Sequence, residues 1–253
     1  MTTLIIQSYR THDIPSWIAR CLASVRAWSS AKAYDYLLTD DDAFALCGEE
    51  YLAKVGDNKR SITNLCRLEL IRRALDDGYD RAIWMDADIF VFAAGQLDFA
   101  TPDRISFPRE TWLRPENGGT NVVLTLNNCV IVCPRGDPDL DLIIEATRHR
   151  ARHHAVTHNF QVGVHLIRGL HRFLDFPLLS NVGMFSNYAL GALAQNNKPL
   201  IEVQARYHGT PVYAANICAS DHQAPVVPEA VAHAAMDILE RTAGEVVNSH
   251  LPA

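Results

Sequence analysis

The sequence lacks the long apolar runs and the basic excess that mark two large classes of protein. No apolar run approaches the ~20 residues that a membrane-spanning helix needs. The chain carries 23 Lys and Arg against 29 Asp and Glu, a formal net charge of −6, whereas non-specific binding of nucleic acid needs a basic surface. We therefore expect no transmembrane segment and no nucleic-acid partner, and peripheral contact with a membrane stays open.

The sequence also lacks a disulfide or zinc pattern. Its six cysteines are scattered, and although Cys129 and Cys133 are four residues apart, no second pair accompanies them. Buried free thiols in a reducing compartment are the simpler interpretation. No basic-then-apolar signal pattern opens the chain, because its first residues are typical of a strand. These features predict a cytoplasmic protein.

What the sequence does contain predicts a single α/β domain. Hydrophobic residues make up 48% of the 253 residues and charged residues 21%, which is enough for a substantial core. Short apolar runs alternate with segments of helical periodicity, the rhythm of a mostly parallel sheet flanked by helices. The expected strands are 4–6, 34–39, 81–85, 105–107, 121–126 and 129–133, with 201–203 extended. A loop containing Pro115 and Gly118-Gly119 is expected between 105–107 and 121–126. The expected helices begin near Pro15, Ser61, Leu140 and Pro228, with Ser61 as an N-cap.

The most informative feature is Asp86-Ala87-Asp88, directly after the apolar run Arg81 to Met85. Side chains two apart on an extended backbone point the same way, so both carboxylates are expected to face one spot at the edge of the sheet. Ligands of such sheets bind outside the carboxyl ends of the strands. Two close carboxylates repel unless a cation lies between them. A hard divalent ion such as Mn²⁺ or Mg²⁺ would relieve the repulsion and could bridge to a phosphate.

Three segments together resemble a known group of enzymes. They are Thr63 to Ile71, Gly78-Tyr79, and Ile83 to Val91. In this order they are similar to nucleotide-sugar glycosyltransferases of the GT-A fold, including the glycogenin-like enzymes and the short mannosyl- and galactosyltransferases of polysaccharide synthesis. The resemblance covers about residues 1–92 and fades afterwards. It implies a nucleotide-binding half over about 1–92 and a donor-sugar and acceptor half over about 93–253.

The resemblance assigns roles to several polar residues. Asp86 would contact the ribose and the metal, and Asp88 would be the principal metal ligand. Arg67 matches the arginine of the family's Ser-Asp-x-x-Arg pattern, and Asn64 lies three residues earlier on the same helical face. This chain has Thr63-Asn64 in place of Ser-Asp, so it lacks one carboxylate of the pattern.

Further donor contacts follow from the resemblance, each with a plainer alternative. Gln7 and Tyr9 follow the first strand, where these enzymes receive the nucleoside base, although Tyr9 is equally compatible with simple packing. Asn127 stands in the family's Asn-x-Gly position and would touch the donor sugar; otherwise it is a turn residue. Asp40 follows the second strand and is better explained as a helix N-cap.

The third metal ligand of this fold usually comes from late in the chain. His208, which precedes Gly209 in an expected accessible loop, is the first candidate, with Asp221-His222 as its rival and no protein ligand as a third alternative. The cluster from His149 to His158 contains pairs four residues apart, but Arg150 and Arg152 would repel a cation. A solvated basic helix face is the favoured interpretation there.

The sequence thus predicts a metal-dependent glycosyltransferase that moves a hexose from a UDP- or GDP-sugar to a saccharide or other hydroxyl acceptor. A retaining outcome rests on the resemblance alone. We name no catalytic base, because Glu110, Asp137 and Asp175 carry no distinguishing pattern.

Alternatives to the transferase remain. An Asp pair can be a solvated turn, and Arg67 can pair with Glu69 or Asp77 at the surface. A phosphohydrolase of the haloacid dehalogenase type also uses Asp-x-Asp, but at the first strand and with later motifs that this chain lacks. A nucleotidyltransferase would need a glycine-rich phosphate loop where Gln7 to Arg10 stands. A non-enzymatic binding module would leave the two aspartates without a role.

Overall fold

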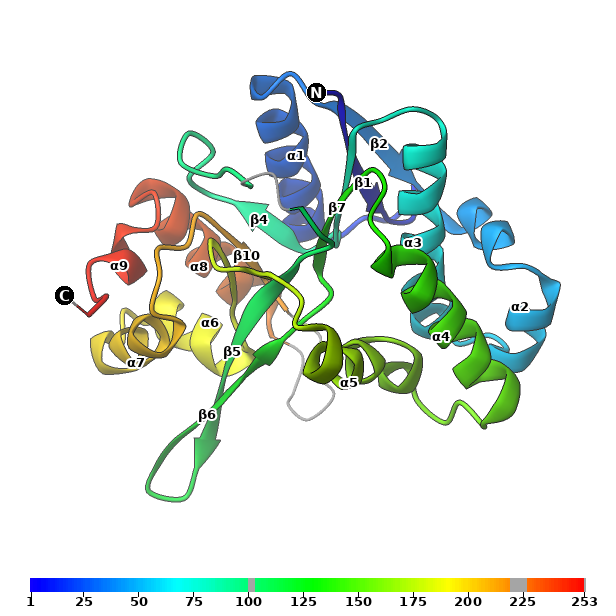
Figure 1. Ribbon diagram of the computed structural model, residues 1–253. Helices are drawn as coiled ribbons and strands as arrows, with labels where there is room; N and C mark the ends of the chain where they lie inside the picture. The colour runs from blue at the N-terminus through cyan, green and yellow to red at the C-terminus, as the bar shows by residue number, and fades with distance from the viewer. Residues whose placement is uncertain (100–102, 219–226, 253) are drawn as a thin grey trace.

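The central sheet of the computed structural model, which describes residues 1–99, 103–218 and 227–252, has the strand order β2–β1–β3–β7 (Figure 1). β1 is parallel to both β2 and β3, whereas β7 is antiparallel to β3. The bounds of these strands are β1 (Thr3–Ser8), β2 (Asp35–Thr39), β3 (Arg81–Met85) and β7 (Val130–Pro134). The expected parallel pairing of the first three strands is confirmed.

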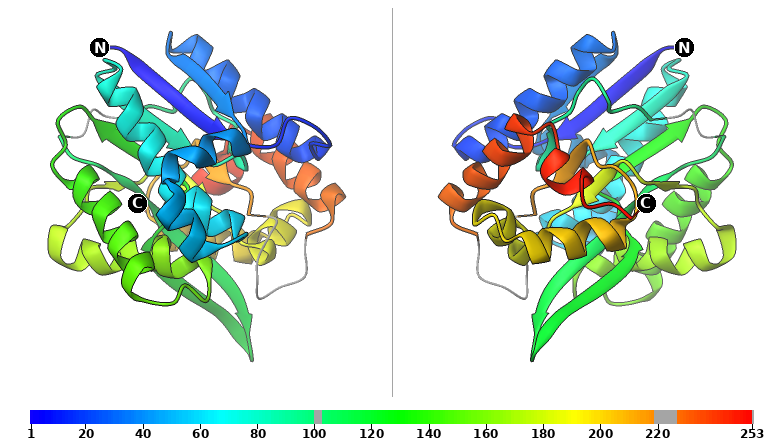
Figure 2. Two further views of the ribbon diagram at one scale, coloured as in Figure 1. Left: turned by 90° about the vertical axis from the view of Figure 1, so that its right-hand side faces the viewer. Right: turned by 90° about the vertical axis from the view of Figure 1, so that its left-hand side faces the viewer.

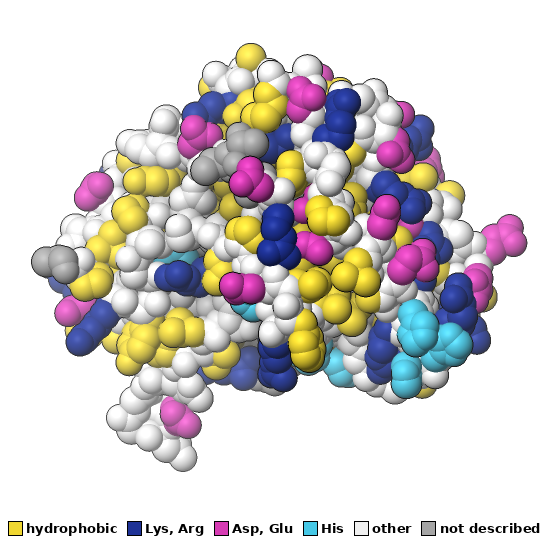
Figure 3. Space-filling view, viewed as in Figure 1, with side chains coloured by type: hydrophobic (Ala, Val, Ile, Leu, Met, Phe, Trp, Pro, Cys, Tyr) yellow, Lys and Arg dark blue, Asp and Glu magenta, His cyan; other side chains and the backbone are white. Residues whose placement is uncertain are grey.

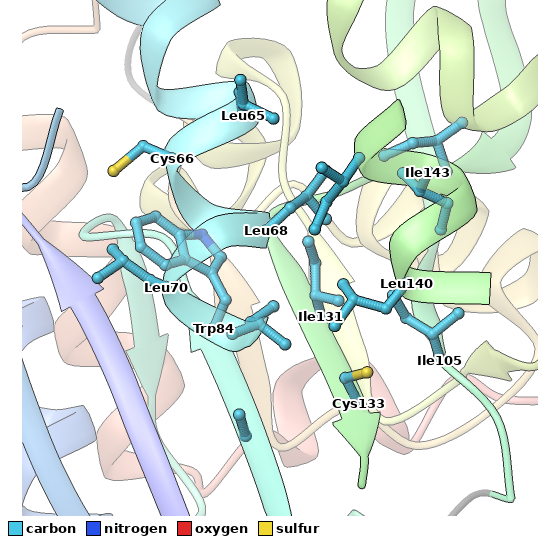
Figure 4. Packing of buried hydrophobic residues seen from close by; sticks show 14 of the residues in the cluster. Leu65, Cys66, Leu68, Leu70, Trp84, Ile105, Ile131, Cys133, Leu140 and Ile143 are labelled. Carbon is cyan, nitrogen blue, oxygen red and sulfur yellow. The ribbon is translucent and has the colours of Figure 1, made fainter. Parts of the chain in front are cut away.

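Both faces of this sheet are buried, as the continuous apolar runs of its strands require. Ile6 and Trp84 belong to the core cluster under helix α3 (Lys59–Asp76), and Trp84 lies there beside Leu70 and Cys66 (Figure 4). Ile5 and Ile83 belong to the cluster on the opposite face, with residues of helix α1 (Ser16–Ala31). Figure 2 shows β1 between these two helices. The period-2 alternation along each strand therefore divides the core between two helical layers.

Two smaller sheets adjoin the central one. In the first, β10 lies between β4 and β9; in the second, β5 lies between β6 and β8. Their bounds are β4 (Ile89–Val91), β5 (Phe107–Glu116), β6 (Gly119–Leu126), β8 (Leu178–Leu179), β9 (Val182–Met184) and β10 (Ala214–Asn216). β4 follows β3 after only three residues, so the chain passes from the central sheet into the β4–β10–β9 sheet through Asp86 to Asp88.

The remaining helices pack around these sheets. Residues of α6, α7 and α8 form a second large apolar cluster with Phe90 of β4 and Leu113 of β5. The bounds of all the remaining helices, including two 3₁₀ segments, are η1 (Asp41–Cys47), α2 (Glu49–Val55), α4 (Asp139–His153), η2 (Asn159–Val162), α5 (Val164–Leu174), α6 (Asn187–Ala194), α7 (Lys198–His208), α8 (Glu229–Arg241) and α9 (Glu245–Asn248). In the described part of the chain no helix is long and apolar enough to cross a membrane.

Three sequence-based expectations about local structure are wrong. Helix α3 is capped by Asn58, whose side chain accepts a hydrogen bond from the Ser61 N–H, so Ser61 lies inside the helix. Residues 201–203 are helical: α7 has an Asn197 N-cap, and its buried residues fall at 201, 204, 205 and 208, which is helical spacing. The segment around Pro115 is strand, because β5 runs through it to Glu116 and pairs with β6.

The β5–β6 hairpin projects away from the body of the molecule (Figure 1). Gly118 has φ +82 at its tip, a conformation that favours glycine. Pro115 is tolerated because it lies near the tip of the ribbon, where its missing N–H disrupts little of the ladder. The glycine and proline signals were correctly placed at a turn, but the turn is much shorter than the loop that we expected.

We predict opposite effects for two glycine substitutions in neighbouring segments. A Cβ on Gly163 would lie 2.3 Å from Asn64 Nδ2, whose amide is held by Asn159 and Asn128. Gly163→Ala should therefore lower the free energy of unfolding by about 1–3 kcal/mol through the loss of those hydrogen bonds. Gly169→Ala, inside α5 with nothing within 4 Å of its Cβ, should raise it by about 0.5–1 kcal/mol.

Urea denaturation of both variants and the parent checks the pair. Equal effects of the two substitutions, in either direction, would contradict the packing of Asn64 against Gly163.

Candidate functional site

The turn that contains Asp86 and Asp88 lies at the edge of the central sheet where the parallel strands end. The Asp86 N–H donates to the Cys129 carbonyl at 2.7 Å, and the Ile89 N–H donates to the Asp86 carbonyl at 3.0 Å. These backbone bonds fix the turn between β3, β4 and the residue before β7. Because β1 is parallel to β3, Tyr9 leaves the sheet at the same edge.

The Asp86 carboxylate is held by an indole and a guanidinium. Trp84 Nε1 donates to Asp86 Oδ1 at 2.6 Å, and an Arg67 nitrogen lies 3.2 Å from the same oxygen. Arg67 is only 8% exposed, lies over the Trp84 ring at 5.2 Å, and donates to the Asn128 carbonyl at 2.6 Å. The structure thus brings the predicted Arg67 and Asp86 together.

Arg67 does not form the surface ion pair with Glu69 or Asp77 that the sequence left open. Glu69 pairs with Arg72 and Arg148, and Asp77 lies nearest to Arg73.

Asp88 is anchored by the strand that pairs with β4. Asn216, the last residue of β10, donates from Nδ2 to Asp88 Oδ1 at 2.7 Å. The Ile217 N–H donates to the Asp88 carbonyl at 2.9 Å. Hydrogen bonds to the two aspartate side chains from other described residues all end on Oδ1. The Oδ2 atoms are therefore the oxygens left for a ligand.

Both carboxyl groups have pKa values raised above the usual range of aspartate. Burial raises the pKa of Asp88 to about 7, and the charge of Asp86 contributes to that rise. Burial also raises the pKa of Asp86, against the opposing effects of Arg67 and the Trp84 hydrogen bond. A site that pushes both acids toward protonation is one that a cation would stabilise.

The donor set fits a hard divalent cation. Two carboxylates lie at one turn, and the oxygen of the Asn216 side chain is buried with no hydrogen-bond donor among the described residues. Oxygen ligands of this kind suit Mn²⁺ and Mg²⁺, which complete their coordination with water and substrate phosphate. In residues 1–99, 103–218 and 227–252 no three side chains of His, Cys, Asp and Glu gather as a metal site.

Of the two residues predicted to follow the first strand, Gln7 lies within β1 and is buried, whereas Tyr9 follows β1 and remains partly exposed. Gln7 is fully buried; its Nε2 donates to the Asp86 carbonyl at 3.1 Å, and its Oε1 accepts from the Tyr36 hydroxyl at 2.9 Å. Gln7 therefore holds the Asp86 backbone and does not face the solvent. Tyr9 packs in a small apolar cluster that includes Ala87, beside the aspartate turn.

The predicted asparagines also make contacts inside the protein. Asn64 bridges the Asn159 carbonyl and the Asn128 side chain. Asn127 accepts from the Cys129 N–H at 2.9 Å and donates to Glu110 Oε2 at 3.2 Å, so it shapes the turn before β7 while staying partly exposed. Both asparagines thus support the backbone around Arg67 and Asp86.

His208 differs from its prediction. It is the last residue of α7 and is 1% exposed, so it does not lie in an accessible loop. Its Nε2 lies 2.8 Å from the Ser180 carbonyl, and its Nδ1 lies 3.3 Å from the Thr111 hydroxyl. Both ring nitrogens therefore have partners within the protein, and among the described residues His208 does not gather with Asp86 and Asp88 as a metal site. The rival Asp221-His222 lies outside the described residues.

Glu110 is a third carboxylate near the site that the sequence did not distinguish. It is buried on β5, and its Oε2 pairs with Arg168 as well as Asn127. Burial raises the pKa of the Cys129 thiol well above its usual range, and Asp86, Asp88 and Glu110 add to the rise. The charges of these three carboxylates therefore all act on the Cys129 thiol.

The other two acids considered as bases have structural roles. Asp137 accepts from the Asp139 and Leu140 N–H groups at the start of α4, and Asp175 caps α5.

The histidine-rich helix α4 is only partly the solvated face that we expected. His149 and His153 are exposed, with ring centroids 4.4 Å apart, and histidines gather over the lower right of the molecule in Figure 3. Arg148 and Arg152 on the same helix instead pair with Glu69 and Glu50. These ion pairs hold α4 against α3 and α2.

Asp40 is a helix N-cap, as expected, rather than a contact of the donor. Its side chain accepts from the Asp42 N–H, so it caps η1.

Comparison with known proteins identifies the fold. The sequence matches no protein-family model and no curated protein. The structure is similar to a glycosyltransferase involved in the glycosylation of the major capsid of PBCV-1, with 12% identity, 94% of this chain and 100% of that chain covered, and a TM-score of 0.50. The chain has the fold of a glycosyltransferase.

The structure also aligns with mouse xyloside xylosyltransferase 1 in its apo form. That alignment has 13% identity, covers 89% of this chain and 99% of that chain, and has a TM-score of 0.42. Of these two, only the first reaches a TM-score of 0.5, and at 12% identity it establishes a shared fold and nothing finer. The predicted α/β single-domain fold is confirmed.

We predict that Asp88→Asn stabilises the metal-free protein at alkaline pH. The pKa of Asp88, about 7 in the folded protein, exceeds the ~3.9 of an unfolded aspartate, so the folded state binds the proton more tightly. Its contribution to stability is present at low pH and is lost as pH rises from about 4 to about 7. The side-chain amide introduced at position 88 keeps an oxygen that accepts from Asn216 Nδ2 and removes the negative charge.

The expected gain in the free energy of unfolding at pH 8 is on the order of 1–3 kcal/mol, with little gain at pH 4.5. Urea denaturation in the presence of a chelator measures the free energy of unfolding at each of these two pH values. Asp57→Asn, at an exposed position, is the control and should change stability by less than about 0.5 kcal/mol at either pH. A destabilised Asp88→Asn at pH 8 would contradict the assigned repulsion.

Proposed function

We propose that this protein is a metal-dependent glycosyltransferase that uses a nucleoside-diphosphate sugar as donor. The observation that carries the proposal is the partly buried pair Asp86 and Asp88, clamped at a sheet edge by Arg67, Trp84 and Asn216. The fold shared with a glycosyltransferase supports it.

Asp88 and Asp86 would hold Mn²⁺ or Mg²⁺, which supplies positive charge to the diphosphate as the sugar departs. Arg67 is buried between Asp86 and the Asn128 carbonyl, so its main task is to fix the orientation of Asp86. Gln7 fixes the backbone of the same residue from the other side. The chain thus preorganises the carboxylates before substrate arrives, which spares reorganisation during the reaction.

The donor would lie along the edge from Tyr9 to Asn127. Tyr9, partly exposed beside Ala87, would stack on the base. Asn127, partly exposed at the turn before β7, would face the sugar, and its contact with the buried Glu110 would hold its amide in place. A hexose from UDP or GDP, a saccharide or other hydroxyl acceptor, a retaining outcome and a cytoplasmic location remain our predictions from the sequence. We assign no catalytic base.

The phosphohydrolase alternative is not favoured. A dehalogenase-type nucleophile would follow the first strand, whereas Asp86 follows β3, after β1 and β2. Arg67 and Trp84 both engage Asp86 Oδ1, which suits a residue held in place.

A thermal-shift panel of nucleoside diphosphates, with and without Mn²⁺, tests the proposal. We expect UDP or GDP to raise the melting temperature only when Mn²⁺ is present, because the cation must bridge the aspartates and the diphosphate. Asp88→Ala should abolish that shift. Asp57→Ala, at an exposed site away from the turn, should retain it.

Two results would overturn the proposal. One is the absence of any metal-dependent shift across the panel. The other is a full shift in Asp88→Ala.

A further inference from the structure

Asn216 has a buried oxygen that nothing in the described structure satisfies. The residue is 3% exposed, and its Nδ2 donates to Asp88 Oδ1 at 2.7 Å. Its Oδ1 is buried and accepts no hydrogen bond from residues 1–99, 103–218 or 227–252. A buried acceptor without a partner lowers stability, so each such atom in a folded protein needs an explanation.

The contact with Asp88 fixes which end of the amide faces the carboxylate. Turning the amide over would bring Oδ1 against Asp88 Oδ1, two acceptors that repel. Nδ2 therefore faces Asp88. Because Oδ1 and Nδ2 are bonded to the same carbon, Oδ1 is held close to the carboxylate.

The backbone makes this arrangement rigid. Asn216 lies opposite Ile89 in the antiparallel pairing of β10 with β4, and the Ile217 N–H donates to the Asp88 carbonyl at 2.9 Å. A parallel pairing with β9 holds the other side of β10. The amide is therefore positioned by a central strand of its sheet, which suits a preorganised ligand.

We propose that Asn216 Oδ1 is the third protein ligand of the divalent cation held by Asp86 and Asp88. The inference rests on the proposed function, since it concerns the same cation. Amide carbonyl oxygens are ordinary ligands of hard cations. With Asn216 the protein ligands are all oxygen, which favours Mn²⁺, Mg²⁺ or Ca²⁺ over the softer Zn²⁺ and Ni²⁺.

Binding of Mn²⁺ alone to the full chain, followed by the electron paramagnetic resonance signal of free Mn²⁺, tests the inference. Asn216→Leu removes both the ligand oxygen and the N–H donor and should weaken Mn²⁺ binding by about 10–100-fold. Asn216→Asp keeps an oxygen and loses the donor, and it should bind Mn²⁺ at least as tightly as the parent. Asn121→Leu, at an exposed position on β6, should leave binding unchanged.

The Asn216→Asp result separates a ligand from a positioning role. If Asn216 served only to orient Asp88 through Nδ2, Asn216→Asp would weaken binding as much as Asn216→Leu, and the inference would be overturned. Parental affinity in Asn216→Leu would overturn it as well.

A spectroscopic measurement on the parent protein keeps the test independent of how the variants fold. Electron spin-echo modulation of bound Mn²⁺ should show no strong coupling to a directly bonded nitrogen; such coupling would mean an imidazole ligand and would overturn the inference. If the parent binds no Mn²⁺, or if Asp88→Ala binds it as tightly as the parent, the proposed function itself fails. Those results can be distinguished from a result that removes only Asn216 as a ligand, in which the parent binds Mn²⁺ and Asp88→Ala does not.

Discussion

The repulsion between Asp86 and Asp88 is the constraint on which the rest of the structure depends. Each carboxylate belongs to a three-residue turn that joins the central sheet to the β4–β10–β9 sheet, and burial makes its charge costly. The chain anchors the turn from several directions, through Gln7 from β1, Arg67 from α3 and Asn216 from β10. These elements are far apart in the sequence, so the folded sheet edge is what makes the site.

Much of the fold could be predicted because its signals are local. The continuous apolar runs of β1, β3 and β7 and the helical periodicity of α1 are complete within each segment. The errors arose where local signals were ambiguous. Residues 201–203 contain β-branched side chains, but the Asn197 N-cap and the buried spacing of α7 make them helical, and Pro115 is accommodated near the tip of a hairpin.

The charged residues of the candidate site could be predicted from the sequence, but the residues that hold them in place could not. Asp86, Asp88 and Arg67 belong to a local pattern of helix, turn and strand, so the sequence pointed to them together. Trp84 and Asn216 were missed because their roles are hydrogen bonds to those aspartates, one of them across 128 residues of chain. His208 was misplaced for the opposite reason: its neighbouring glycine, φ +78, caps a helix and does not open a loop.

The most direct test of the account is a crystal of the full chain grown with MnCl₂ and UDP, examined at the manganese absorption edge. The account predicts one anomalous peak beside Asp88 and Asp86, with oxygens of the diphosphate completing the coordination. A peak at another position, or UDP bound at this edge with no cation between it and the aspartates, would contradict the central claim.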